Sequence, residues 1–105
     1  MNPLPWHAQP LPQRGLLPRC PGVNVARSWF GLGQPLYAGQ STNLRERWAG
    51  SRHHRLRQLP WHARLWYQPC PGWRAWELRR YERWLIRRLR PRLNYTRRRP
   101  WWRVW

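Results

Sequence analysis

Carboxylates are scarce in this chain, and their scarcity limits the chemistry that it can perform. The 105 residues contain three glutamates and no aspartate. The glutamates are Glu46, Glu77 and Glu82. An acid–base mechanism with two carboxylates needs a matched pair, and a two-metal cage needs several ligands. The composition therefore nearly excludes both, and it favours a site built on one carboxylate.

Glu82 is the carboxylate whose position is unusual. Between residues 74 and 91, apolar side chains recur at spacings of three and four, which predicts an amphipathic helix that Pro91 ends. Glu82 falls on the apolar stripe of this helix, which also carries Ala75, Leu78, Leu85 and Leu89. A carboxylate there is costly unless it is paired, bound to a metal or facing a cleft. A structural ion pair with one of the many arginines and a metal site are the two explanations.

Positive charge dominates the composition. Arginine supplies all 21 basic residues, and the formal net charge is +18 at pH 7. A compact domain with this charge repels itself and attracts a polyanion. Nucleic acid and an anionic membrane surface are the candidates, and arginine suits both because it grips phosphate and stacks on aromatic rings. The 11 tryptophans could stack on bases, lie at a bilayer interface or fill the core.

Neither a membrane span nor a secretory signal is expected. No apolar run approaches the roughly 18–20 residues that a spanning helix needs. Prolines interrupt residues 1–22, which therefore lack the continuous apolar stretch of a signal peptide, and we expect a cytoplasmic protein. Cys20 and Cys70 each lie in a Cys-Pro-Gly triplet, and we expect reduced thiols beside turns.

The remaining pattern indicates a small α+β domain. β-branched and aromatic residues predict strands at residues 22–30, 36–39 and 64–69. The turn residues between the first two strands predict a hairpin. The order is then strand, strand, helix, strand, helix.

The first helix is expected to begin after Asn43, the candidate N-cap, with Glu46 three residues later in a capping-box arrangement. Residues 53–59 are expected to continue or restart it, and Pro60 stops it. Glu77, near the start of the second helix, is expected on the solvated face.

Two triplets and a helix resemble the GIY-YIG nuclease domain, which occurs in phage homing endonucleases and in the incision subunit of bacterial nucleotide-excision repair. The first family triplet falls on residues 22–24 and the second on residues 37–39. The helix arginine of the family, ten residues past the second tyrosine, matches Arg47. Its metal-binding glutamate matches Glu82, and the asparagine that closes the same segment matches Asn94.

The resemblance implies a fold and a reaction. The fold is a small three-stranded antiparallel sheet flanked by helices, and the reaction is hydrolysis of a DNA phosphodiester with one divalent metal, Mg²⁺ or Mn²⁺. Glu82 would hold the metal, and Arg47 would stabilise charge on the phosphate. Tyr37 would orient or deprotonate the attacking water, and Asn94 would hold the helix end against the hairpin.

The sequence departs from the family pattern in two places. The tyrosine of the first triplet, a candidate general base, is replaced by Asn24, which cannot accept a proton at neutral pH. The histidine or tyrosine that often follows the helix arginine is replaced by Ser51, and His53 and His54 come two residues later. Either histidine could take over that role, or the two form a basic surface pair. We therefore expect a slow endonuclease, with a catalytically silent nucleic-acid-binding module on the same fold as the alternative.

The chain divides into three parts on this basis. Residues 1–20 are a proline-rich N-terminal arm, residues 21–95 are the nuclease-like domain, and residues 96–105 are a tail rich in arginine and tryptophan. The tail is expected to add nonspecific DNA affinity, and membrane binding is its alternative. The sequence does not indicate an oligomeric state or a DNA target.

Overall fold

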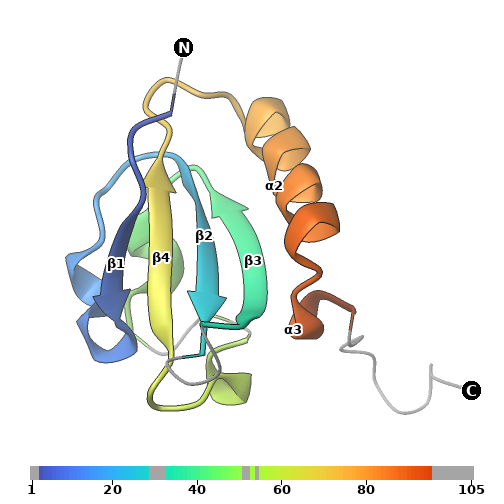
Figure 1. Ribbon diagram of the computed structural model, residues 1–105. Coiled ribbons are helices and arrows are strands. Elements are labelled where there is room, and N and C mark those ends of the chain that lie inside the picture. The colour runs from blue at the N-terminus through green and yellow to red at the C-terminus, as the bar shows by residue number, and fades with distance from the viewer. Residues whose placement is uncertain (1–2, 29–32, 51–52, 54, 96–105) are drawn as a thin grey trace, which may run out of the picture.

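A four-stranded antiparallel sheet forms the centre of the molecule (Figure 1). The structure is a computed structural model that describes residues 3–28, 33–50, 53 and 55–95. The strands, in their order across the sheet, are β1 (His7–Pro10), β4 (Arg64–Pro69), β2 (Gly22–Arg27) and β3 (Pro35–Ser41). The α+β class is confirmed, as are the three strands and the hairpin that the sequence predicts.

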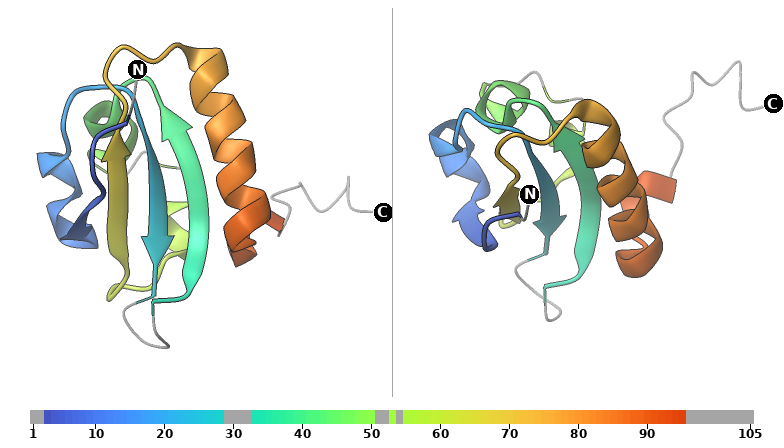
Figure 2. Two further views of the ribbon diagram at one scale, coloured as in Figure 1. Left: turned by 45° about the horizontal axis from the view of Figure 1, so that its top comes forward. Right: turned by 90° about the horizontal axis from the view of Figure 1, so that it is seen from above.

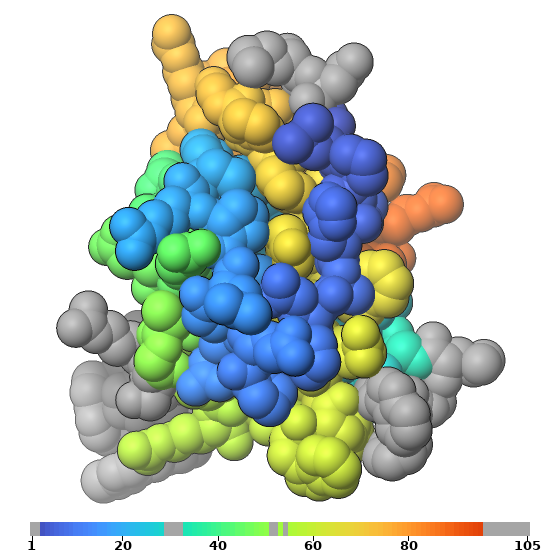
Figure 3. All heavy atoms as spheres, turned by 90° about the vertical axis from the view of Figure 1, so that its left-hand side faces the viewer, coloured from blue at the N-terminus to red at the C-terminus, as the bar shows by residue number. Residues whose placement is uncertain are grey.

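The fourth strand, β1, comes from the segment that we expected to be an arm. Residues 7–10 pair with β4, so the predicted count of three strands was one too low. Prolines concealed this strand, but an edge strand tolerates proline because one row of its N–H groups needs no partner. The following 3₁₀ helix, η1 (Leu11–Leu16), is also anchored, since Leu11 and Leu17 are buried in the core. Figure 3 shows this segment in blue beside residues of β4 in yellow.

The sheet has a core on each face because neighbouring residues of a strand point to opposite sides. On one face, called the α1 face, Ala26 belongs to a cluster with Trp48. On the other, called the α2 face, Val23 packs with Leu78 and Leu85. Tyr37 belongs to the cluster on the α1 face, whereas a groove of about 540 Å³ lies on the α2 face.

Helix α1 (Leu44–Trp48) is shorter than the sequence predicts. It starts where expected, because Asn43 is its N-cap and accepts a hydrogen bond from the Glu46 N–H. It stops early because Ala49 is extended and Gly50 has a φ of 70°. Residues 53–59 were expected to continue or restart this helix. Their described members do not continue it, and the one helical element among them is a 3₁₀ turn, η2 (Leu56–Gln58).

Helix α2 (Ala75–Leu89) runs beside β3 and is followed by the short helix α3 (Arg92–Tyr95) (Figure 2). Its predicted end is confirmed: Arg90 adopts a left-handed conformation with a φ of 48°, and Pro91 follows. Glu77 is partly exposed and accepts a hydrogen bond from the Arg74 N–H at the start of the helix. None of the helices in the described residues is long and apolar enough to cross a membrane.

Both cysteines are free thiols, as expected. Cys70 is buried on the α2 face, and burial raises the pKa of its thiol to about 11. Burial also raises the pKa of the Cys20 thiol. Since the thiolate is the reactive form, both side chains are chemically quiet near neutral pH.

Candidate active site

The candidate site lies along the outer edge of β3. This strand has a sheet neighbour on one side only, so alternate backbone groups point away from β2. The Ala38 N–H donates to Asn94 Oδ1 at 2.7 Å, and the Ala38 carbonyl accepts from Asn94 Nδ2 at 2.9 Å. Two residues on, the Gln40 N–H donates to the carboxylate of Glu82. Asn94 on α3 and Glu82 on α2 thus make the hydrogen bonds that a further strand would make at this edge. Through its two bonds, Asn94 holds α3 against the hairpin, which is the role that the resemblance implies for it.

Tyr37 occupies this edge and is 7% exposed. Burial raises the pKa of its phenol, and the charge of Arg47 and a hydrogen bond from that guanidinium offset part of the rise. The negative charge of Glu82 raises the pKa of Tyr37 further, and the nearby Arg55 lowers it. Because the net shift is upward, the phenol stays protonated near neutral pH.

Glu82 is half-buried between α2 and β3, and burial raises the pKa of its carboxyl group. The charge of Arg47 opposes this most strongly, followed by Arg83, the Gln40 N–H and Arg79. The net shift is still upward, so these arginines do not fully compensate for the lost hydration of the carboxylate. Arg47 is therefore within electrostatic reach of both Glu82 and Tyr37, and the site would accommodate further positive charge.

The absence of a side chain at Gly39 leaves room for the Tyr37 ring. A Cβ atom at Gly39 would lie 3.0 Å from Tyr37 Cε2 and 3.1 Å from the phenol oxygen. Separations this short are not tolerated without displacement of the ring. The glycine of the second triplet thus allows the tyrosine to lie along its own strand.

The start of α1 fixes the direction of Arg47. Ser41 Oγ accepts a hydrogen bond from the Asn43 N–H at 3.0 Å and donates to the Asn43 carbonyl at 2.9 Å. Asn43 Oδ1 in turn accepts from the Glu46 N–H at 3.1 Å. The Arg47 N–H then donates to the Asn43 carbonyl at 3.1 Å. These contacts connect the end of β3 to the helix, so that Arg47 is held relative to Tyr37.

His53 is buried beside Tyr37 rather than exposed in a basic surface pair. Its ring stacks on Trp48, with centroids 3.7 Å apart and an interplanar angle of 11°, and its edge meets Tyr37 at 5.3 Å. Its Nδ1 accepts a hydrogen bond from the Arg55 N–H at 3.1 Å. A neutral imidazole with this bond carries its proton on Nε2 and presents a donor there, which does not suit a general base. His54 lies outside the described residues.

Asn24 is buried rather than open to the site. It pairs across the sheet with Gly39, so its side chain points to the α1 face, and it is 1% exposed. Its Nδ2 finds no hydrogen-bond partner among the described residues. A buried amide hydrogen without a partner costs free energy.

A polar pocket of about 360 Å³ opens beside these residues. Its walls are Ser41, Thr42, Asn43, Glu46, Arg47 and His53. Arg47 connects the pocket to Tyr37 and Glu82, which do not line it.

Glu46 and Arg55 were not selected as site residues from the sequence. Glu46 was expected to act only at the start of α1, yet it also lines the pocket. Arg55 is 8% exposed and acts on Tyr37. No signal in the sequence distinguishes Arg55 from the 20 other arginines of the chain.

Glu82 has the donor chemistry for a divalent cation. In the described part of the chain, no three histidine, cysteine, aspartate or glutamate side chains gather into a metal cage. Mg²⁺ does not need such a cage, since it binds through one or two carboxylates together with waters and substrate phosphates. A carboxylate whose charge is incompletely compensated fits this mode of binding.

Comparisons with known proteins bear on the fold. No protein-family model matches the chain, and no curated protein matches it. Two solved structures do, and both are of the GIY-YIG N-terminal endonuclease domain of UvrC from Thermotoga maritima. The first, a tyrosine-to-phenylalanine point mutant bound to the catalytic divalent cation, has a TM-score of 0.60 at 22% identity. The second, an asparagine-to-alanine point mutant bound to its catalytic divalent cation, has a TM-score of 0.53 at 20% identity.

Each match covers 78% of this chain and 91% of the other. The shared part is thus nearly the whole of that endonuclease domain. It agrees with the sheet and helix order described above and with the two triplets at residues 22–24 and 37–39. The chain therefore has a GIY-YIG-like nuclease fold.

Proposed function

We propose that this protein is a metal-dependent DNA endonuclease of the GIY-YIG type that hydrolyses phosphodiester bonds slowly. The observation that carries the proposal is the position of Arg47, whose guanidinium acts on the Tyr37 phenol and on the Glu82 carboxylate at the same edge of β3. A phosphate bound beside Arg47 would lie next to a hydroxyl group and a carboxylate. The net charge of +18 favours DNA as the partner.

Each side chain has a distinct task in this proposal. Arg47 binds a non-bridging phosphate oxygen and stabilises the charge that develops there. Glu82 would hold a divalent cation, Mg²⁺ or Mn²⁺, which would supply charge neutralisation for the leaving oxygen. Tyr37 positions the attacking water through its phenol oxygen. Asn94 is a positioning residue that keeps β3 in place.

The proposed slowness follows from the absence of a ready base among these groups. Tyr37 remains a phenol near neutral pH because burial raises its pKa. His53 presents a donor at Nε2 when neutral, and Asn24 is a buried amide. General-base assistance is typically worth about 10² to 10⁴ in rate, and Tyr37, His53 and Asn24 are not placed to supply it near neutral pH.

The buried Asn24 also supports a second candidate, a catalytically silent module that binds nucleic acid on the same fold. In that case phosphate contacts from the arginines supply the affinity. Both candidates predict steep salt dependence. If about six phosphates are neutralised, the affinity for duplex DNA falls by about three decades between roughly 50 and 200 mM salt.

Plasmid nicking separates the two candidates. The purified protein is incubated with supercoiled plasmid in Mg²⁺, in Mn²⁺ and in chelator, and nicking is expected only with metal. Glu82→Gln is expected to abolish it while leaving DNA binding intact. Glu77→Gln, on the same helix, is the matched control, because it removes the same charge from a residue that only caps α2.

A further variant tests the missing base. Asn24→Tyr restores a phenol at the first triplet. Because Asn24 is 1% exposed, a thermal melt first checks that the larger ring is accommodated, and the folded variant is expected to nick at least about tenfold faster. A wild type that does not nick with either metal, and that this variant does not revive, would support the silent module. Nicking that survives in Glu82→Gln and stops in Glu46→Gln would assign the metal to the other carboxylate.

A further inference from the structure

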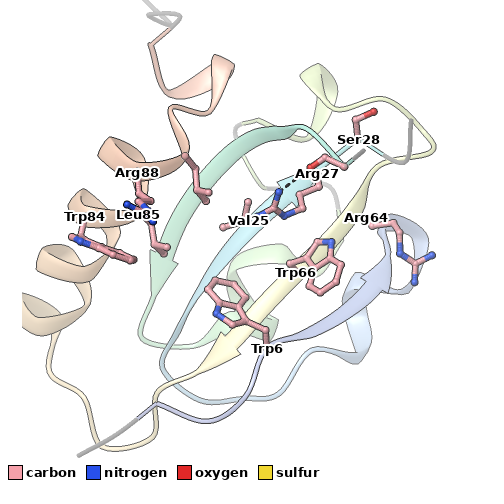
Figure 4. A pocket seen from close by; sticks show the side chains of 11 residues that line it. Trp6, Val25, Arg27, Ser28, Arg64, Trp66, Trp84, Leu85 and Arg88 are labelled. Atoms are coloured by element: carbon pink, nitrogen blue, oxygen red, sulfur yellow. Dashed lines mark hydrogen bonds between the residues drawn. The ribbon is translucent and has the colours of Figure 1, made fainter. Parts of the chain in front are cut away.

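A groove with both aromatic and cationic lining lies away from the candidate active site. It has a volume of about 540 Å³, within the range of roughly 300–1,000 Å³ that is usual for ligand pockets. Figure 4 shows Trp6 and Trp66 on its sheet side and Trp84 and Arg88 on its α2 side. Its polar lining also includes Arg27, Ser28 and Arg64.

The groove belongs to the α2 face of the sheet. Val25 lines it, whereas the next residue along β2, Ala26, belongs to the cluster that contains Tyr37 and Trp48. Neighbouring residues of a strand point to opposite faces. The sheet therefore separates the groove from Tyr37, and a ligand in the groove would not enter the polar pocket beside Arg47.

Two of the tryptophans present open ring surface. Trp66 on β4 is 36% exposed and Trp84 on α2 is 54% exposed. Trp84 also stacks on Tyr81, with centroids 5.9 Å apart, which helps to hold its ring in place. Large apolar surface that gathers in one groove indicates a binding site, because water is a poor partner for it.

All the charged side chains that line the groove are arginines. Arg64 and Arg88 make no hydrogen bond or ion pair with another described residue, and Arg27 donates to the Gly33 carbonyl at 2.9 Å. None of the three glutamates of the chain is among the lining residues. Two guanidinium groups without a partner among the described residues, beside flat rings, are complementary to a ligand with phosphates and planar bases.

We infer that this groove binds single-stranded nucleic acid, with bases stacked on Trp66 and Trp84 and phosphates bound by Arg64 and Arg88. A duplex is excluded as the occupant because its bases are already stacked on one another and offer no free face to a tryptophan. The site is separate from the pocket beside Arg47. It does not depend on the proposed cleavage reaction.

The experiment measures binding of a labelled oligothymidine of about 12 nucleotides by fluorescence anisotropy, in chelator so that no cleavage intervenes. Trp66→Ala and Trp84→Ala are each expected to weaken binding by about 5- to 150-fold. Trp76→Ala is the matched control, since Trp76 lies on the same helix, is 52% exposed and does not line the groove. It is expected to leave the affinity unchanged.

Two arginine variants provide a second test in case a tryptophan variant does not fold. Arg88→Gln removes a groove residue, whereas Arg87→Gln removes the same charge from its exposed neighbour outside the groove. Only Arg88→Gln is expected to lower the salt slope of oligothymidine binding by about one. Equal slopes and equal affinities in the two variants would overturn the inference.

Tryptophan variants that fold and bind oligothymidine like the wild type would overturn the inference, as would variants that lose binding only to phosphatidylserine vesicles. Oligouridine of the same length distinguishes RNA from DNA as the source of the ligand. Glu82→Gln is expected to bind oligothymidine normally, so loss of cleavage in the proposed active site and loss of groove binding are separate results.

Discussion

Asn94→Ala tests whether the edge of β3 depends on one side chain. Its two hydrogen bonds, at 2.7 and 2.9 Å, are made to the N–H and the carbonyl of Ala38, and both are partly buried. Alanine leaves both backbone groups unpaired. An unpaired buried polar group costs about 1–3 kcal/mol. Because water has partial access to both Ala38 groups, each cost lies near the lower end of that range, and we expect the free energy of unfolding to fall by about 2–3 kcal/mol.

This loss is measured as the free energy of unfolding in urea and as a fall in Tm. For a domain of this size, about 1 kcal/mol corresponds to roughly 4–8 °C, so the melting temperature should fall by about 8–24 °C. Asn94→Asp is the control. It keeps an acceptor for the Ala38 N–H and loses the donor to the Ala38 carbonyl, so it isolates one of the two bonds.

Activity is expected to fall with stability, because Ala38 adjoins Tyr37 and a loosened edge no longer fixes the phenol. A stability within about 0.5 kcal/mol of the wild type would refute the reasoning. A variant that keeps its stability but loses nicking would instead show that Asn94 contacts the DNA or the reacting atoms.

Three other perturbations give independent checks. In urea melts, Glu82→Gln is expected to be more stable than the wild type at pH 7 and equal to it below about pH 4. Burial raises the pKa of the Glu82 carboxyl in the folded state, so the wild type loses stability as the pH rises through the folded-state pKa. If Tyr37 deprotonates the water, only its phenolate form is active, and burial raises the pKa of the phenol. The nicking rate should therefore increase about tenfold per pH unit up to about pH 9.5, and a rate that levels off below about pH 8 would exclude this role. Gly22→Ala should destabilise the fold by about 1–3 kcal/mol, because its Cβ would lie 2.6 Å from the Gln68 carbonyl oxygen. Thermal melts should show no such loss for Gly15→Ala, where nothing lies within 4 Å, and equal losses would contradict the steric argument.

Local pattern was sufficient for most of the elements. The strands at residues 22–27 and 64–69 are rich in β-branched and aromatic residues, and the helix at residues 75–89 has its own period and a proline at its end. Such signals reside in a few consecutive residues, so a sequence contains them completely. The N-cap at Asn43 is local in the same way, and the structure confirms it.

The site combined local and long-range information. The order and spacing of Tyr37, Arg47 and Glu82 could be read along the chain and led to the fold that the comparisons support. The hydrogen bond between Glu82 and the Gln40 N–H on β3 could not be predicted from the sequence. The two residues lie 42 positions apart, and the apolar stripe shows only that the carboxylate is buried.

Tertiary structure alone decided the remaining features. The prolines near residues 7–10 argue against a strand until β4 offers an edge to pair with. The Arg55 N–H sets the tautomer of His53, and no pattern of residue types encodes a hydrogen bond to one ring nitrogen rather than the other. The sequence by itself determined which elements form and which residue types the site contains, since these depend on neighbours along the chain. Only the folded chain decided which groups meet, because burial, hydrogen bonding and charge at the site come from segments that lie far apart in the sequence.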